Sequence, residues 1–319
     1  MCRVITPDQL NYAVDFSWNL CSDMKQRSYP LFRSRSQMLQ EFRWSIEHEN
    51  GELVGWFEGK ELRGILCYYW LPEDSYLQTT GFYIAGTGEN GEARETDKNG
   101  KAGENGEPCG PDQKIADDFL SYLEHKFPDY KINIGIPAEN RRAAGVLTEH
   151  GFTVTEASHD MRLIKEDFRK LPVLHKIIRI DETNFDHYAA FHDVHFQDIY
   201  WNTERLRSHI NEWDIFVIRE SKDIAGCIFS QTSGDSSAGN DGADSDSNDC
   251  SDYGEIFGMY AADAQSAYSL LSATLCNMFV KAPLIQEVIY FIEDHEQTAR
   301  QTALHCGFRT TSHYQLWVK

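Results

Sequence analysis

The sequence predicts an α/β protein made of two halves that share one order of elements. Short β-rich runs alternate with amphipathic helical stretches along the 319 residues. The same order returns after about 156 residues, so that Gly151-Phe152 corresponds to Gly307-Phe308. At about 100–200 residues per domain, the length fits two domains.

The first half starts with helical spacing after Thr6, a helix-capping residue type. A short turn at 59–61 separates two strands, and Gly151 ends the last helix. The expected helices are 6–23, 36–50, 113–127 and 139–151, and the expected strands or extended runs are 51–59, 62–71, 75–85, 131–138 and 152–164.

The second half repeats this order. Its expected helices are 182–200, 202–211, 263–281 and 295–307, and its expected strands are 177–181, 213–221, 223–231, 253–261, 287–294 and 308–318. The charged segment 165–176, which contains Pro172, reads as a linker between domains 1–164 and 177–319.

Two acidic segments interrupt the globular composition. Residues 86–112 and 232–252 carry about half of the net charge of −20 and almost no large apolar side chains, so we expect mobile loops. Within the first, GTGENG (86–91) matches a dinucleotide fingerprint, but no helix is expected to follow it. In the second, 244–255 matches a calcium loop in part, without the central glycine. We favour solvated loops for both.

The composition excludes several classes of partner. A net charge of −20 opposes binding to nucleic acid and anionic membranes. No stretch approaches the ~20 apolar residues of a membrane helix, and the first residues do not resemble a secretory signal. The eight cysteines form no C-x-x-C pair, so neither a zinc knuckle nor a thioredoxin-like site is indicated. Scattered cysteines in a chain without a signal are typical of reduced thiols in the cytoplasm, where we expect the protein.

The end of each half resembles the end of a GNAT-superfamily N-acetyltransferase domain. That pattern is a strand, an Asn, a helix with Ala three residues on, and Gly-Phe before a last strand pair. Asn140, Ala143 and Gly151-Phe152 match it in the first half. In the second half Ala299 and Gly307-Phe308 match, and Glu296 stands where Asn would be. The chain therefore looks like a tandem of two GNAT-like domains, each with a mixed, mainly antiparallel sheet and helices on both faces.

The resemblance implies a site for acetyl-CoA as co-substrate. In the family, a strand and the following helix meet at a loop whose N–H groups hold the pyrophosphate. A bulge splays that strand from the next and opens a V for the pantetheine arm. By this resemblance the expected coenzyme-binding residues are Gln113, Lys114, Ile115, Ala116, Asn140 and Arg141 in the first half, and Met259, Tyr260, Ala261, Gln265, Ser266 and Ala267 in the second.

The sequence departs from the family at two places. Lys114 and Gln265 replace the first glycine of the pyrophosphate loop, and Leu147 and Ala303 replace the helix tyrosine that often protonates the leaving thiolate. We favour the second half for the chemistry because its strand-to-helix turn is short. The expected catalytic residues are Glu255 as base, with Tyr260, His305 and Tyr314 as acids.

The expected function is acetyl-CoA-dependent transfer of an acetyl group to a primary amine of a small molecule or peptide. The alternative is a non-catalytic protein whose degenerate GNAT domains bind CoA or a partner. No metal ligands are assigned, since His187, His192 and His195 fit a polar helix face better than a metal site.

Overall fold

A computed structural model describes residues 1–85, 111–197, 199–220, 223–233 and 253–319. The chain forms two compact units, and each is described by itself below. Unit 1 contains 1–156 and 315–319, and unit 2 contains 157–314. Most of the acidic segments expected at 86–112 and 232–252, including GTGENG and most of the calcium-like match, lies outside the described residues. Of these segments, 111–112 belongs to a helix and 232–233 to a strand.

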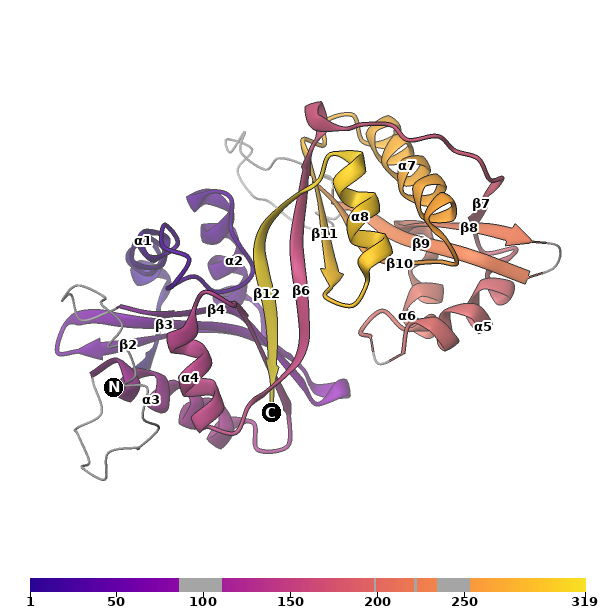
Figure 1. The fold of residues 1–319 in the computed structure, drawn as a ribbon. Helices are drawn as coiled ribbons and strands as arrows, with labels where there is room; N and C mark the ends of the chain where they lie inside the picture. The colour runs from indigo at the N-terminus through magenta and orange to yellow at the C-terminus, as the bar shows by residue number, and fades with distance from the viewer. Residues whose placement is uncertain (86–110, 198, 221–222, 234–252) are drawn as a thin grey trace, which may run out of the picture. The chain divides into compact units, whose positions relative to one another are not determined.

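Unit 1 is a sheet with a pair of helices on each face (Figure 1). Its strands are ordered β1-β2-β3-β4-β5, and the end of β12 pairs with β5 through Ile132 and Lys319. Helices α1 and α2 pack with one core cluster, and α3 and α4 pack with the other. The elements are β1 (Cys2–Val4), α1 (Leu10–Leu20), α2 (Arg35–Glu47), β2 (Gly51–Glu58), β3 (Glu61–Leu71), β4 (Tyr76–Ile84), α3 (Pro111–Lys126), β5 (Lys131–Pro137), α4 (Arg141–Glu149) and β6 (Thr153–Ile164).

Unit 2 has the same plan, with strand order β7-β8-β9-β10-β11-β6-β12. Helices α5 and α6 lie on one face of its sheet, and α7 and α8 lie on the other (Figure 1). The elements are β7 (Ile177–Ile180), α5 (Phe185–His195), α6 (Thr203–Ser208), β8 (Trp213–Glu220), β9 (Asp223–Ser233), β10 (Tyr253–Ala261), α7 (Ala264–Lys281), β11 (Glu287–Glu293), α8 (Gln297–Cys306) and β12 (Arg309–Val318). The expected α/β class, with mixed sheets and helices on both faces, is confirmed.

The units do not follow the two halves of the sequence. Residues 158–164 of β6 pair with β11 in unit 2, and 315–319 belong to unit 1. The segment 165–176, expected as a linker, packs within unit 2. The hydroxyl of Ser272 accepts from the Leu171 N–H and donates to the Leu171 carbonyl, and the Ser269 hydroxyl accepts from the Leu174 N–H. Both serines are buried on α7. Ser269 also donates to the Gln265 carbonyl of α7 at 2.9 Å, whereas both hydrogen bonds of the Ser272 hydroxyl go to this segment.

Candidate coenzyme cleft and acceptor face

In unit 1, β4 and β5 separate but the chain itself fills the gap. Their parallel pairing ends at Gln78 and Asn133. Beyond that point the Phe82 N–H donates to the Ser28 hydroxyl at 3.0 Å, and the Tyr29 N–H donates to the Gly135 carbonyl at 3.0 Å. Both inserted residues are buried. The segment between α1 and α2 therefore takes the backbone partners that a coenzyme arm would need.

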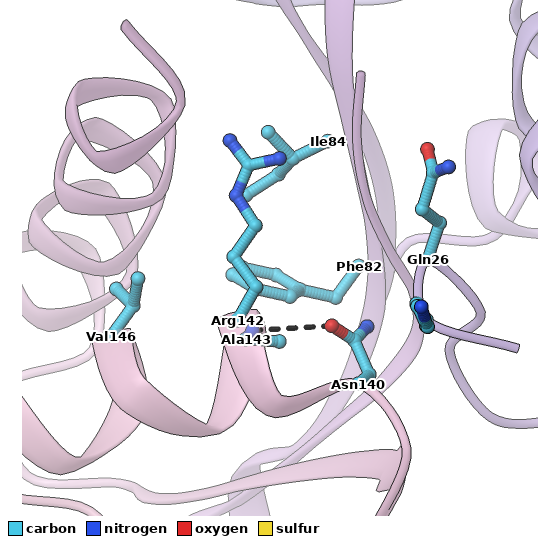
Figure 2. A pocket seen from close by; sticks show the side chains of 8 residues that line it. Gln26, Phe82, Ile84, Asn140, Arg142, Ala143 and Val146 are labelled. Atoms are coloured by element: carbon cyan, nitrogen blue, oxygen red, sulfur yellow. Dashed lines mark hydrogen bonds between the residues drawn. The ribbon is translucent and has the colours of Figure 1, made fainter. Parts of the chain in front are cut away.

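A small cavity remains beside this insertion. Its volume is about 30 Å³, close to the space of one water molecule. Figure 2 shows Arg142 extended past Phe82 and Ile84, while Asn140 holds the start of α4 through the Ala143 N–H. The cavity is too small for a pantetheine arm.

Four of the six coenzyme-binding residues expected in unit 1 have structural contacts instead. Ile115 and Ala116 are buried in the core under α3. Gln113 donates to Glu149 at 2.8 Å. Asn140 donates to the Arg27 carbonyl at 2.8 Å, which anchors the inserted segment. Lys114 and Arg141 are exposed.

In unit 2, β10 and β11 separate in the same way. Their parallel pairing ends at Ile256 and Tyr290, and a bulge lies at Phe257 in the pairing of β10 with β9. Within the described parts of unit 2, no other segment forms a backbone hydrogen bond in this gap. Among the described residues, the gap between β10 and β11 therefore has no inserted segment like the one that fills the gap of unit 1.

The bulge at Phe257 interrupts the regular alternation of side chains between the two faces of β10. Regular alternation places Glu255, Phe257 and Met259 on one face. Instead, Met259 joins Ile256 in the core under α7, while Phe257 packs against the cluster under α5 and α6. The extra residue at Phe257 shifts the side-chain register by one position. Sequence periodicity alone could not locate that bulge.

The turn after β10 carries a negative charge at the start of α7. The Asp263 carboxylate accepts from the Ser266 N–H at 2.8 Å, and its hydrogen bonds, led by this one, lower the pKa of Asp263. Ser266 and Ala267 are buried, whereas Gln265 is exposed. The helix N-terminus expected to hold pyrophosphate therefore already has a carboxylate on its N–H groups.

Removing that charge tests the use of this turn. Asparagine caps helices about as well as aspartate, so Asp263→Asn should keep the fold. If coenzyme phosphates bind here, the affinity for acetyl-CoA should rise several-fold, because the substitution removes a charge repulsion of about 1 kcal/mol in water. Calorimetric titration at low and high salt measures this affinity. Asp181→Asn is the control, since its carboxylate also accepts from a backbone N–H, that of Thr183. Equal affinity in wild type and Asp263→Asn would place the phosphates elsewhere.

Three of the four expected catalytic residues lie on the α5/α6 face of unit 2. A Cβ on Gly254 would meet Met278 of α7, so the next residue, Glu255, points to the opposite face. Tyr260 lies further along β10 on that face and is 38% exposed. The Tyr314 ring packs edge-on against Phe291 at 5.3 Å.

His305 is separated from this group. It lies on α8, where Nδ1 contacts the Gln301 carbonyl at 2.7 Å and the ring packs edge-on against Tyr268 of α7. Helices α7 and α8 cover the other face of the sheet. His305 is therefore not assembled with Glu255 and Tyr260.

The α5/α6 face of unit 2 is the candidate acceptor face. The structure adds His195 to it, a residue that the sequence did not single out for this role. The His195 ring of α5 packs against Tyr260 in a tilted arrangement with ring centroids 3.9 Å apart, and Phe191 packs edge-on against the same ring. In contrast, His192 is buried, with Nδ1 near the Tyr188 hydroxyl and Nε2 near the Trp201 carbonyl. Burial lowers the pKa of His192. Both histidines lie on α5, and only their packing shows that His195 contacts Tyr260 while His192 is buried.

A wider cavity of about 410 Å³ lies in unit 1, beside α2 and the end of β3. Its lining residues include Glu41, Trp44 and Tyr69. Burial raises the pKa of Glu41 above that of an exposed glutamate, and a hydrogen bond with Thr80 lowers it in part. The folded protein therefore binds a proton at Glu41 more readily than the unfolded chain does.

That shift predicts a pH effect on stability. A raised folded-state pKa makes the unfolding free energy fall as pH rises above the ordinary glutamate pKa. Glu41→Gln keeps the shape without the charge, so its melting temperature should exceed that of wild type at about pH 7–8, with the gap closing near about pH 4. Melting curves over this range measure it, with the exposed Glu47→Gln on α2 as control. A wild type that is more stable than Glu41→Gln at high pH would contradict the assignment.

Comparisons with known proteins identify the fold. No protein-family model and no curated protein matches this chain. A GCN5-related N-acetyltransferase from Sphaerobacter thermophilus superposes with TM-score 0.63 at 13% identity, over 100% of this chain and 95% of that one. A tandem GNAT protein from the clavulanic acid biosynthesis pathway gives TM-score 0.55 at 10% identity, over 100% and 98%. A Pyrococcus horikoshii structure described as a putative acetyltransferase gives 0.53 at 11%, over 100% and 88%.

These likenesses establish the class of structure. The chain has the GNAT fold in tandem, as the resemblance of its Gly-Phe segments predicts. At these identities the likeness concerns the fold alone. Among the described helices, none combines the length and apolar character required to cross a bilayer.

Proposed function

We propose that this protein is an acyl-CoA-dependent N-acyltransferase whose coenzyme binds in the V of unit 2. The observation that carries the proposal is the difference between the two gaps. Ser28 and Tyr29 fill the gap of unit 1, whereas β10 and β11 of unit 2 part beyond Ile256 without an inserted segment among the described residues. Acetyl-CoA is the coenzyme expected from the fold, and a primary amine is the expected acceptor.

The chemistry requires a base and an acid beside the gap. The amine nitrogen attacks the thioester carbonyl, the C–N bond forms, and the C–S bond breaks to release the CoA thiolate. Glu255 lies on the acceptor face before the splay and serves as base for the amine proton. Tyr260 lies beyond the bulge and serves as donor to the thiolate. His195, which packs against Tyr260, orients that ring.

The second candidate function is non-catalytic binding of CoA or a partner. The plugged gap of unit 1 favours it, as does the carboxylate of Asp263 at the start of α7. Leu147 and Ala303, in place of the family's helix tyrosine, also favour it.

Titration with acetyl-CoA, followed by hydrogen exchange, separates these functions. We expect saturable binding, with slower amide exchange in β10, β11 and the start of α7. Exchange in 28–30 and 79–84 of unit 1 should not change. Release of free CoA thiol in the presence of a panel of amines then measures turnover.

Each other outcome has a defined meaning. Slower amide exchange in unit 1 alone would overturn the assignment of the coenzyme site to unit 2. Binding without turnover on any amine would favour the non-catalytic function. No binding at all would overturn both CoA-based functions.

A further inference from the structure

Two histidines and one aspartate of unit 2 converge at one point. His159 lies on β6, His313 lies on β12, and Asp294 lies in the turn between β11 and α8. The Oδ1 atom of Asp294 is 3.4 Å from Nε2 of His159 and 2.8 Å from Nε2 of His313. All three ligand atoms lie within 4.8 Å of one another. In the described parts of the chain, no other group of His, Cys, Asp and Glu is this close.

The backbone holds the three residues in place. His159 is in register with Ile292 of β11, and the Asp294 N–H donates to the Ala157 carbonyl at 3.1 Å. The Thr311 hydroxyl donates to the Asp160 carbonyl at 3.1 Å, which links β12 to β6. The three ligands therefore project from two strands of a preformed sheet and from the turn after β11, so little ordering is needed for them to act together.

The spacing suits a small divalent ion. Tetrahedral bonds of about 2.0–2.2 Å to nitrogen and oxygen place neighbouring ligand atoms roughly 3.3–3.5 Å apart. The contact between His159 and Asp294 already has this length. The contact between His313 and Asp294 must open by about half an ångström.

The charges at the site have opposing effects. A metal ligand must be a neutral imidazole. Burial, followed by the positive charge of Arg300, lowers the pKa of His159. However, the Arg300 charge also repels a cation. Asp294 supplies the negative charge, and its half-exposed side chain leaves room for water.

We propose that His159, Asp294 and His313 bind a divalent transition-metal ion such as zinc, with water in the remaining positions. Each imidazole binds through the Nε2 lone pair and carries its proton on Nδ1, so no proton is released from a neutral ring and no redox change occurs. Imidazole and carboxylate together favour zinc, cobalt or iron over calcium or magnesium. The ion would tie β6, β12 and the β11–α8 turn together.

The test is titration of the metal-free, reduced full chain with Zn²⁺ and Co²⁺. We expect one ion per chain, a Co²⁺ absorption spectrum without a thiolate band, and a higher melting temperature of unit 2. His159→Gln, His313→Gln and Asp294→Asn should each weaken binding at least about tenfold. Arg300→Gln should tighten it, because a repelling charge is gone. His125→Gln on α3 is the matched control and should bind as wild type does.

Two results would overturn the proposal. The first is a His159→Gln/His313→Gln double variant that binds Zn²⁺ as tightly as wild type does. This result would place the ion elsewhere. The other is a thiolate band with Co²⁺, which would assign the ion to cysteines. Should the variants fold poorly, imidazole NMR of wild type decides, since Zn²⁺ must then shift the His159 and His313 signals. Unshifted signals would exclude the site.

Discussion

Gly307→Ala is expected to destabilise unit 2 by more than about 4 kcal/mol, whereas Gly151→Ala should cost unit 1 only about 1–2 kcal/mol. Both glycines end a helix before Phe with a positive φ, at +106° for Gly307 and +80° for Gly151. A methyl group on Gly307 would lie 2.2 Å from the Asp167 carbonyl oxygen, but nothing lies within 4 Å of one on Gly151. The first substitution therefore combines backbone strain with a collision against main chain, which cannot rotate away as a side chain can.

Denaturant unfolding of the two single variants measures this difference, with each serving as the control for the other. The collision partner, Asp167, lies in the segment expected as a linker, which the Arg169 N–H fixes to the Cys306 carbonyl at 2.9 Å. Equal losses for both variants would show that this segment moves aside easily. It would then not be an integral part of unit 2.

Glu255→Gln is expected to lower acyl transfer by about 10²–10⁴-fold, the usual contribution of a general base, while acetyl-CoA affinity changes little. The substitution keeps the shape and removes the proton acceptor. Turnover of a good amine acceptor between about pH 6 and pH 9 measures it. Glu220→Gln, at the exposed end of β8, is the matched control. Tyr260→Phe should lower the rate where protonation of the thiolate is limiting.

An unchanged rate in Glu255→Gln over this pH range would contradict the role of Glu255. The remaining mechanism would be direct attack by an already neutral amine, with Tyr260 or Tyr314 protonating the thiolate. This prediction depends on the proposed acyltransferase activity. A wild type without turnover would remove its basis.

Much of the fold could be predicted from the sequence because it follows local rules. The apolar spacing of α7 and the β-rich run of β10 each indicate one element regardless of their neighbours. The glycines at 151 and 307 end helices because a positive φ favours glycine wherever it occurs. The recurrence of this pattern then predicts two similar domains, which the comparisons of folds confirm.

The site was less predictable, because its features depend on contacts between distant residues. The α/β class, the tandem plan and the residue types near the gap could all be predicted from the sequence. The folded structure was needed to show that Ser28 meets Phe82, that His195 packs against Tyr260, and that His159 meets Asp294 and His313. Such contacts depend on the bulges, the sheet register and the path of the segments between elements. These are set by packing over the whole unit, and neither local spacing nor residue type specifies them.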